Sequence, residues 1–256
     1  MSPSRLPVLA YHAIHPDRSL ISITPGEFEW QLVTLKENGF QVVTLNQLVQ
    51  WIKHGIEFPY RAVVLTFDDG LECIYHFALP ILKKFDFVAM VFLVSGFIDK
   101  DNSWPGQPEI IDKLPTLSWG QIREMDRSGI QFGAHTLTHP RLDLLTPVEI
   151  EREILDCKES IQDQLGHTVD QFAYPYGRYN DQVLNLVKKN FIGACSTRLD
   201  YATPRSDPYL IERIDINYIS HPALFKRLTS SAVSFYLSAR RPLRRFHATL
   251  TRQPWQ

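Results

Sequence analysis

Residues 61–70 read RAVVLTFDDG, a short apolar run that ends in two adjacent carboxylates and a glycine. The run 62–67 is typical of a strand buried on both faces, so Asp68 and Asp69 fall where that strand leaves the core. Adjacent side chains of an extended chain point to opposite sides, so one carboxylate can bind a cation while the other faces a substrate. Asp-Asp-Gly is also ordinary turn chemistry, so the rest of the chain must decide between a site and a turn.

Length and charge narrow the class of protein. The chain has 256 residues, 44% of them hydrophobic, which is enough for one sizeable core. A formal charge of −1 argues against a protein that binds nucleic acid over its whole surface. Residues 222–256 nevertheless hold seven Lys or Arg and no Asp or Glu. This basic tail is suited to weak contact with an anionic membrane, although solvated charge is the commoner explanation.

Cysteine spacing and hydropathy predict the cellular compartment of the protein. Cys73, Cys157 and Cys195 form no C-x-x-C pair, so neither a disulfide framework nor a thiolate zinc site is expected. Residues 1–12 lack the long apolar segment of a signal peptide, and no run of 18 apolar residues exists. The sequence therefore predicts a cytoplasmic protein without a spanning helix, in contact with the membrane only peripherally.

Strand and helix patterns alternate along the chain. Strands are expected over 6–10, 41–45, 62–67, 88–94, 130–134, 171–174, 192–195 and 210–216, and helices over 24–38, 46–52, 72–85, 119–127, 146–165 and 181–189. Repeated βα units predict a parallel α/β sheet, and this many units in one core predict a distorted (β/α) barrel of about seven to eight strands. An open doubly wound sheet is the alternative. Either fold places its site at the carboxyl ends of the strands.

Two further polar motifs follow predicted strands. His135 and His139 are four residues apart, a spacing that places both imidazoles on one face of a helical turn, where they can bind one metal ion. With Asp69 they would leave coordination positions open, as catalytic zinc sites do. With nine histidines in the chain, a pair without a ligand is the alternative. In residues 172–177 (FAYPYG), a fixed backbone N–H could face an oxyanion, or the segment is simply a rigid aromatic turn.

Residues 66–70 (TFDDG), 135–139 (HTLTH) and 174–177 (YPYG) resemble the first three motifs of the polysaccharide deacetylase family, also called NodB-homology proteins or carbohydrate esterase family 4. The resemblance covers about residues 6–216. It implies a deacetylase domain over 1–221, followed by a C-terminal helix and basic tail over 222–256. It also implies a distorted (β/α) barrel that removes acetyl groups from N-acetylated sugars with a divalent metal, usually zinc.

The resemblance also implies roles for residues. Asp68 would be the general base, and the backbone N–H of Tyr176 would donate to the oxyanion. Pro175 and Tyr176 would contact the substrate. The implied ligands of zinc, or of another divalent metal, are Asp69, His135 and His139.

The chain departs from the family pattern at two places. Ala173 stands where many members have an Arg, so another residue must orient Asp68, and Arg213 is the candidate. The late Leu-x-His motif that supplies the general acid is not recognisable, since His221 precedes a proline in a segment that resembles the start of the final helix.

The first strand offers a replacement acid. Tyr11 and His12 resemble the permuted arrangement of poly-N-acetylglucosamine deacetylases, in which that motif comes first. A barrel tolerates this permutation because its first and last strands are neighbours. His12 is therefore the expected acid, and Asp215 is the carboxylate expected to keep it protonated.

The predicted function is the metal-dependent removal of N-acetyl groups from an N-acetylglucosamine-type glycan. A carbohydrate O-acetyl esterase or another amidohydrolase could use the same site. A magnesium phosphohydrolase is disfavoured, since its acids lie two residues apart and it gains nothing from two histidines. The missing Arg keeps open an inactive glycan-binding barrel. Trp104 and Trp119 could stack on sugars, although packing in the core or at the rim is their expected role.

Overall fold

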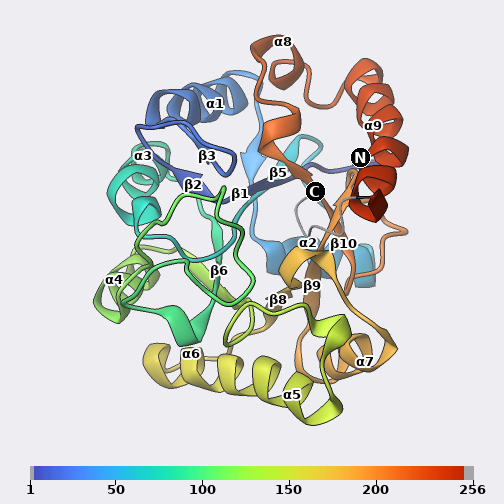
Figure 1. Ribbon diagram of the computed structural model, residues 1–256. Helices are drawn as coiled ribbons and strands as arrows, with labels where there is room; N and C mark the ends of the chain where they lie inside the picture. Colours follow the sequence, from blue (N-terminus) through green and yellow to red (C-terminus); the bar gives the residue numbers. More distant parts are fainter. Residues whose placement is uncertain (1–2, 251–256) are drawn as a thin grey trace.

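The computed structural model describes residues 3–250, with side chains described up to Arg241. Within these residues seven parallel strands form a ring (Figure 1). They are β1 (Val8–Tyr11), β5 (Ala62–Phe67), β6 (Met90–Leu93), β7 (Gln131–Ala134), β8 (Gln171–Ala173), β9 (Gly193–Leu199) and β10 (Ile211–Asp215). The order is β1-β10-β9-β8-β7-β6-β5, and the ring closes where Leu9 of β1 pairs with Leu65 of β5. The predicted barrel is confirmed, and the open sheet is wrong.

Three short strands lie outside the ring. β4 (Gln41–Val42) pairs with the first two residues of β5, and β2 (Ala13–Ile14) and β3 (Ser22–Ile23) form a separate ribbon after β1. The first and last strands of the ring are neighbours, with Ala10 opposite Asp215. The ends of β1 and β10 therefore meet at one mouth of the barrel, as the permuted arrangement requires.

Apolar side chains fill the barrel and close its amino end. Inward positions alternate along each strand, so Val64 of β5 and Ile211 of β10 belong to an inner cluster, whereas Leu65 and Ile214 pack against the outer helices. Helix α2 (Leu45–His54) plugs the amino end, because its Leu45, Leu48 and Val49 join the inner cluster. The opposite mouth is left for polar side chains.

Most helices begin where the sequence predicts. Capping boxes at Thr24 and Ser118 start α1 (Pro25–Glu37) and α4 (Trp119–Arg127), and Asn180 caps α7 (Asp181–Asn190). Helix α2 starts one residue before its expected range of 46–52. Thr44 accepts the Gln47 N–H, and Asn46 lies inside the helix.

Two helices that were expected to be regular contain a π-turn. The first is η1 (Ile74–Ala78), which continues into α3 (Leu79–Phe85). The second, η4 (Arg152–Asp156), lies between α5 (Pro147–Glu151) and α6 (Cys157–Leu165). Short 3₁₀ turns are η2 (Ser95–Phe97), η3 (Leu142–Leu144), η5 (Pro175–Gly177) and η6 (Ile216–Tyr218).

The C-terminal segment forms two helices, α8 (Pro222–Phe225), capped by His221, and α9 (Ser231–Leu250). Val233 and Leu237 of α9 are buried, so this helix packs on the barrel. The end of the basic tail, with Arg252, lies outside the described residues. Its membrane contact and the division into 1–221 and 222–256 stay predictions. Within residues 3–250 no helix combines the length and apolar character needed to cross a bilayer.

Candidate active site

The side chains that face the barrel interior are polar at the mouth formed by the carboxyl ends of the strands. There the residues that follow β5, β7, β8 and β1, together with the end of β10, surround a cavity of about 430 Å³. The predicted site residues that line it are His12, Asp68, Asp69, His135, His139, Tyr176, Arg213 and Asp215. Pro175 is buried and is not among the described residues that line this cavity, so its contact with the substrate stays a prediction.

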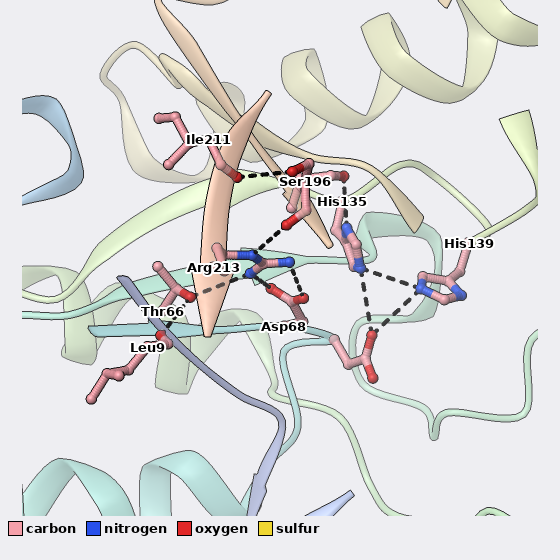
Figure 2. Close-up of polar contacts among 10 residues, drawn as sticks. Leu9, Thr66, Asp68, His135, His139, Ser196, Ile211 and Arg213 are labelled. Atoms are coloured by element: carbon pink, nitrogen blue, oxygen red, sulfur yellow. Dashed lines mark hydrogen bonds and ion pairs between the residues drawn. The ribbon is translucent and has the colours of Figure 1, made fainter. Parts of the chain in front are cut away.

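Asp69, His135 and His139 converge on one point. Figure 2 shows the two imidazoles next to each other there. Asp69 Oδ1 lies 3.6 Å from the Nε2 atom of each imidazole, and the two Nε2 atoms are 3.2 Å apart. Tetrahedral zinc with bonds of about 2.1 Å needs ligand atoms about 3.4 Å apart, so the triad fits an ion of this kind. All three side chains are buried. Three protein ligands leave a coordination position for water or substrate.

Electrostatics and hydrogen bonding favour a cation at this point. Burial raises the pKa of Asp69, and the neighbouring His12 and His135 offset this rise only in part. His135 Nδ1 lies 2.8 Å from the carbonyl oxygen of Ala173, which can only accept, so Nδ1 carries the proton and Nε2 is free to ligate. Burial and then the charge of His135 lower the pKa of His139 well below its ordinary value, which keeps it neutral as a ligand must be.

Asp68 forms a two-point ion pair with Arg213 (Figure 2). Arg213 Nη1 donates to Asp68 Oδ1 and Nη2 donates to Oδ2, each at a distance of 2.7 Å, and both side chains are buried. Arg213 Nε also donates to the Ser196 carbonyl (3.0 Å), and its guanidinium lies over the Phe92 ring. Burial alone would raise the pKa of Asp68, but Arg213 holds that pKa below its ordinary value. The structure thus supplies Asp68 with an arginine from β10 where residue 173 is alanine.

Arg213→Met should lower the free energy of unfolding by about 3–5 kcal/mol at neutral pH, because Asp68 is left buried without its partner. The pKa of Asp68 is depressed in the folded protein, so the stability from this pair is present above the ordinary carboxyl pKa of about 3.9 and is lost as the pH falls through the folded value. Protonation of Asp68 at low pH also removes the unpaired buried charge that destabilises the variant. The difference from wild type in urea unfolding should therefore shrink as the solution is acidified.

Arg198→Met is the matched control, because Arg198 is an exposed arginine on the neighbouring strand β9. It should change stability by no more than about 0.5 kcal/mol. If Arg213→Met does not fold, the double variant with Asp68→Asn removes both charges and should recover stability. A loss that stays constant with pH would show that Asp68 is not the group left unpaired.

His12 and Asp215 stand at the ends of paired strands and both line the cavity. Among the described residues no hydrogen bond or ion pair joins them. Asp215 Oδ1 instead accepts the Asn217 N–H (2.9 Å) and caps η6. The structure therefore places the predicted acid at the mouth, while support from Asp215 stays a prediction.

The motif loops carry an unusual backbone. Asp69, Thr136, His139 and Tyr176 have positive φ values of 74°, 70°, 59° and 58°. Non-glycine residues seldom adopt this region, and such strain persists where the surroundings enforce it, commonly at active sites. The helical turn expected between His135 and His139 is wrong, because left-handed residues rather than a helix bring the imidazoles together.

Trp104 contributes to the site in a way that its local sequence does not show. The side chain is buried, as expected for packing, but its ring centroid lies 4.6 Å from that of His139. Tyr176 contacts the same imidazole, also at 4.6 Å. The loop that carries Trp104 is fastened by Asn102, whose side chain accepts the Leu114 N–H (2.8 Å). No periodicity or motif around residue 104 could have indicated a contact with a residue 35 positions later.

Comparison with known proteins agrees with this geometry. The sequence profile described as polysaccharide deacetylase matches residues 55–192, more than half of the chain. The chain belongs to the polysaccharide deacetylase family. The family predicted from the motifs is thereby confirmed, and the matched span of this family member includes all three of them.

Individual relatives cover more of the chain. The YxkH protein of Bacillus subtilis (strain 168) is 30% identical over 187 residues, which are 73% of this chain and 62% of YxkH, less than two thirds of that protein. The poly-beta-1,6-N-acetyl-D-glucosamine N-deacetylase of Staphylococcus aureus (strain MSSA476) is 29% identical over 216 residues, 80% of this chain and 71% of that enzyme. The solved Streptococcus pyogenes deacetylase PplD in complex with acetate is 29% identical, with a TM-score of 0.74 over 84% of this chain and 93% of PplD.

Proposed function

We propose that this family member is a metal-dependent hydrolase that removes N-acetyl groups from an N-acetylglucosamine-type glycan. The observation that carries the proposal is that one cavity joins the buried triad of Asp69, His135 and His139 to a carboxylate, Asp68, fixed by Arg213. The name of the Staphylococcus aureus relative supports this substrate class. The cytoplasmic location stays a prediction from the sequence.

The triad would hold the metal, for which we propose zinc. Bound there, zinc supplies a Lewis acid and a water of lowered pKa. Asp68 accepts a proton from the attacking water, and Arg213 keeps its carboxylate charged and aimed. That pairing holds the pKa of Asp68 low, so its carboxylate is ionised at neutral pH and can accept a proton.

Two further groups act on the substrate in this proposal. The Tyr176 N–H donates to the oxyanion that develops on the acetyl oxygen. His12 gives its proton to the departing nitrogen, because an amine anion is a very poor leaving group. Acid and base thus come from different strands of the same mouth, β1 and β5.

The rival functions make different demands on the site. An O-acetyl esterase could use the same groups without a proton from His12. An inactive glycan-binding barrel was left open by the missing Arg, and the pair between Arg213 and Asp68 favours an active site instead. A ligand set of two imidazoles and one carboxylate suits zinc better than the magnesium of a phosphohydrolase.

Acetate release tests the proposal directly. The substrates to compare are N-acetylglucosamine oligomers, lipid-linked N-acetyl sugars and O-acetylated sugars. We expect release from at least one N-acetylated substrate, lost on chelation and restored by zinc. Zinc-loaded protein that releases acetate only from O-acetylated sugars would assign the site to an esterase, and protein that releases none would favour the binding barrel.

His135→Ala should reduce bound zinc from about one ion per chain to a small fraction, because two protein ligands hold the ion far more weakly than three. Elemental analysis of protein purified without chelator measures the change. His54→Ala, which alters an exposed histidine of α2, is the control and should keep the full metal content. Full metal and full activity in His135→Ala would refute the assigned ligands.

A further inference from the structure

The loop 135–139 carries two of the three proposed ligands on a backbone that does not hold itself in place. Thr136 and His139 both have left-handed φ values, and Thr136 is β-branched, which makes that conformation especially unfavourable. Inside the loop, one hydrogen bond runs from the His139 N–H to the Thr136 hydroxyl (2.9 Å). The neighbouring elements must therefore supply the rest of the restraint.

One side of the loop is held by the turn after β6. The Ser95 N–H donates to the Thr136 carbonyl (3.2 Å), and the Gly96 N–H donates to the Leu137 carbonyl (2.9 Å). A Cβ atom at residue 96 would lie 2.5 Å from the Leu137 carbonyl oxygen, so this close approach requires glycine. These contacts use two carbonyl groups of the loop and leave the N–H groups of Leu137 and Thr138 to another partner.

That partner is Glu153, a buried residue of the helix behind the loop. Its carboxylate accepts both the Thr138 N–H (2.8 Å) and the Thr138 hydroxyl (2.7 Å). Its own main-chain carbonyl accepts the Leu137 N–H (3.0 Å). A single residue thus holds two successive residues of the loop by three hydrogen bonds, immediately before His139.

The π-turn explains how a helix can offer these groups. Glu153 lies in η4, in the middle of the rod that α5 and α6 form beside the barrel (Figure 1). A π-turn inserts one residue, so one carbonyl loses its usual partner four residues on and becomes free to accept from outside the helix. In a regular helix both the carbonyl and the side chain of residue 153 would be differently directed.

We propose that Glu153 is a positioning residue that sets the metal affinity of the site by fixing the loop 135–139. This inference rests on the proposed metal site and concerns binding rather than turnover. Partners that orient metal ligands typically change metal affinity by about 10–100-fold when they are removed. Glu153 does so through the backbone of the loop, whereas Ala173 orients His135 directly through its carbonyl.

The test measures zinc dissociation constants on metal-stripped protein by competition with a chromophoric chelator. Glu153→Ala should raise the dissociation constant by about 10–100-fold and alter the absorption bands of bound Co²⁺. Glu153→Gln should stay within about threefold of wild type, because its amide can accept from the Thr138 N–H and donate to the Thr138 hydroxyl. Glu151→Ala, at an exposed position two residues earlier, should change nothing.

Several results would overturn the inference. A zinc constant and Co²⁺ spectrum in Glu153→Ala that match wild type would do so, even if the metal-free variant unfolds at lower temperature. If Glu153→Ala does not fold, Thr138→Val removes one of the bonds and should weaken zinc by up to about tenfold; no weakening would count against the role. Wild-type protein that binds zinc but releases no acetate would overturn the proposed reaction and leave the Glu153 result intact.

Discussion

Asp68→Asn should lower kcat for acetate release by about 10²–10⁴-fold while bound zinc stays at about one ion per chain. The amide cannot take the proton of the attacking water, but it keeps the size of the carboxylate and still accepts from Arg213. Asp68 contributes no atom to the metal triad, which consists of Asp69 and the two histidines. Acetate assays and elemental analysis on one preparation measure both quantities. The weakened ion pair with Arg213 should lower the unfolding temperature of the variant, so the assays are run below that temperature.

Asp69→Asn is the matched variant, because the two residues are adjacent and equally buried. Replacing the anionic ligand of the triad should release most of the zinc, and the activity should be lost with it. Added zinc should then restore part of the activity of Asp69→Asn and none of that of Asp68→Asn. Equal loss of metal in both variants would show that the two carboxylates do not divide the roles of base and ligand.

The sequence could predict the features that depend on local chemistry. Apolar runs bounded by capping residues marked the strands and most helices, and parallel strands bring their carboxyl ends together. Asp68, Asp69, His135 and His139 were therefore expected at one mouth, and they line one cavity. Some helix caps and boundaries moved, as at Thr44, because neighbouring polar residues compete for the same role.

The features that the sequence could not show depend on contacts between distant segments. The sequence names Arg213 as the candidate partner of Asp68, but it does not show the two-point ion pair that these residues, 145 positions apart, form in the closed ring. The left-handed turns at Thr136 and His139 are imposed by Ser95, Gly96 and Glu153 from outside the loop. A π-turn has no side-chain signature of its own, so the helix expected over 146–165 looked regular.

Ring closure also supports the choice of His12 as the proposed acid. β1 pairs with both β5 and β10, so the residue after β1 stands between the strand of Asp68 and the strand of Arg213. His221 occupies the position in chain order where the family's late motif would be sought. It instead caps α8 through its Nδ1 atom. Of these two histidines, His12 is the one that lines the cavity.

His12→Gln should lower kcat on N-acetyl substrates by about 10²–10⁴-fold and leave hydrolysis of an activated acetate ester nearly unchanged. The nitrogen of an amide must be protonated as it departs, whereas an activated phenolate or similar group leaves without a proton. His12 is not one of the three ligand residues, so bound zinc should stay at about one ion per chain. Rates on the two substrate types, with metal content, give the comparison.

His15→Gln is the control, since His15 lies three residues later, directly after β2, accepts the Asp17 N–H and is not among the described residues that line the cavity. It should leave both rates unchanged. If His12 were a packing residue instead, His12→Gln would lower the unfolding temperature and impair both substrates together. A variant that keeps its zinc and its stability yet loses amide and ester hydrolysis equally would also remove His12 from the acid role, because only proton donation to the leaving group separates the two substrates.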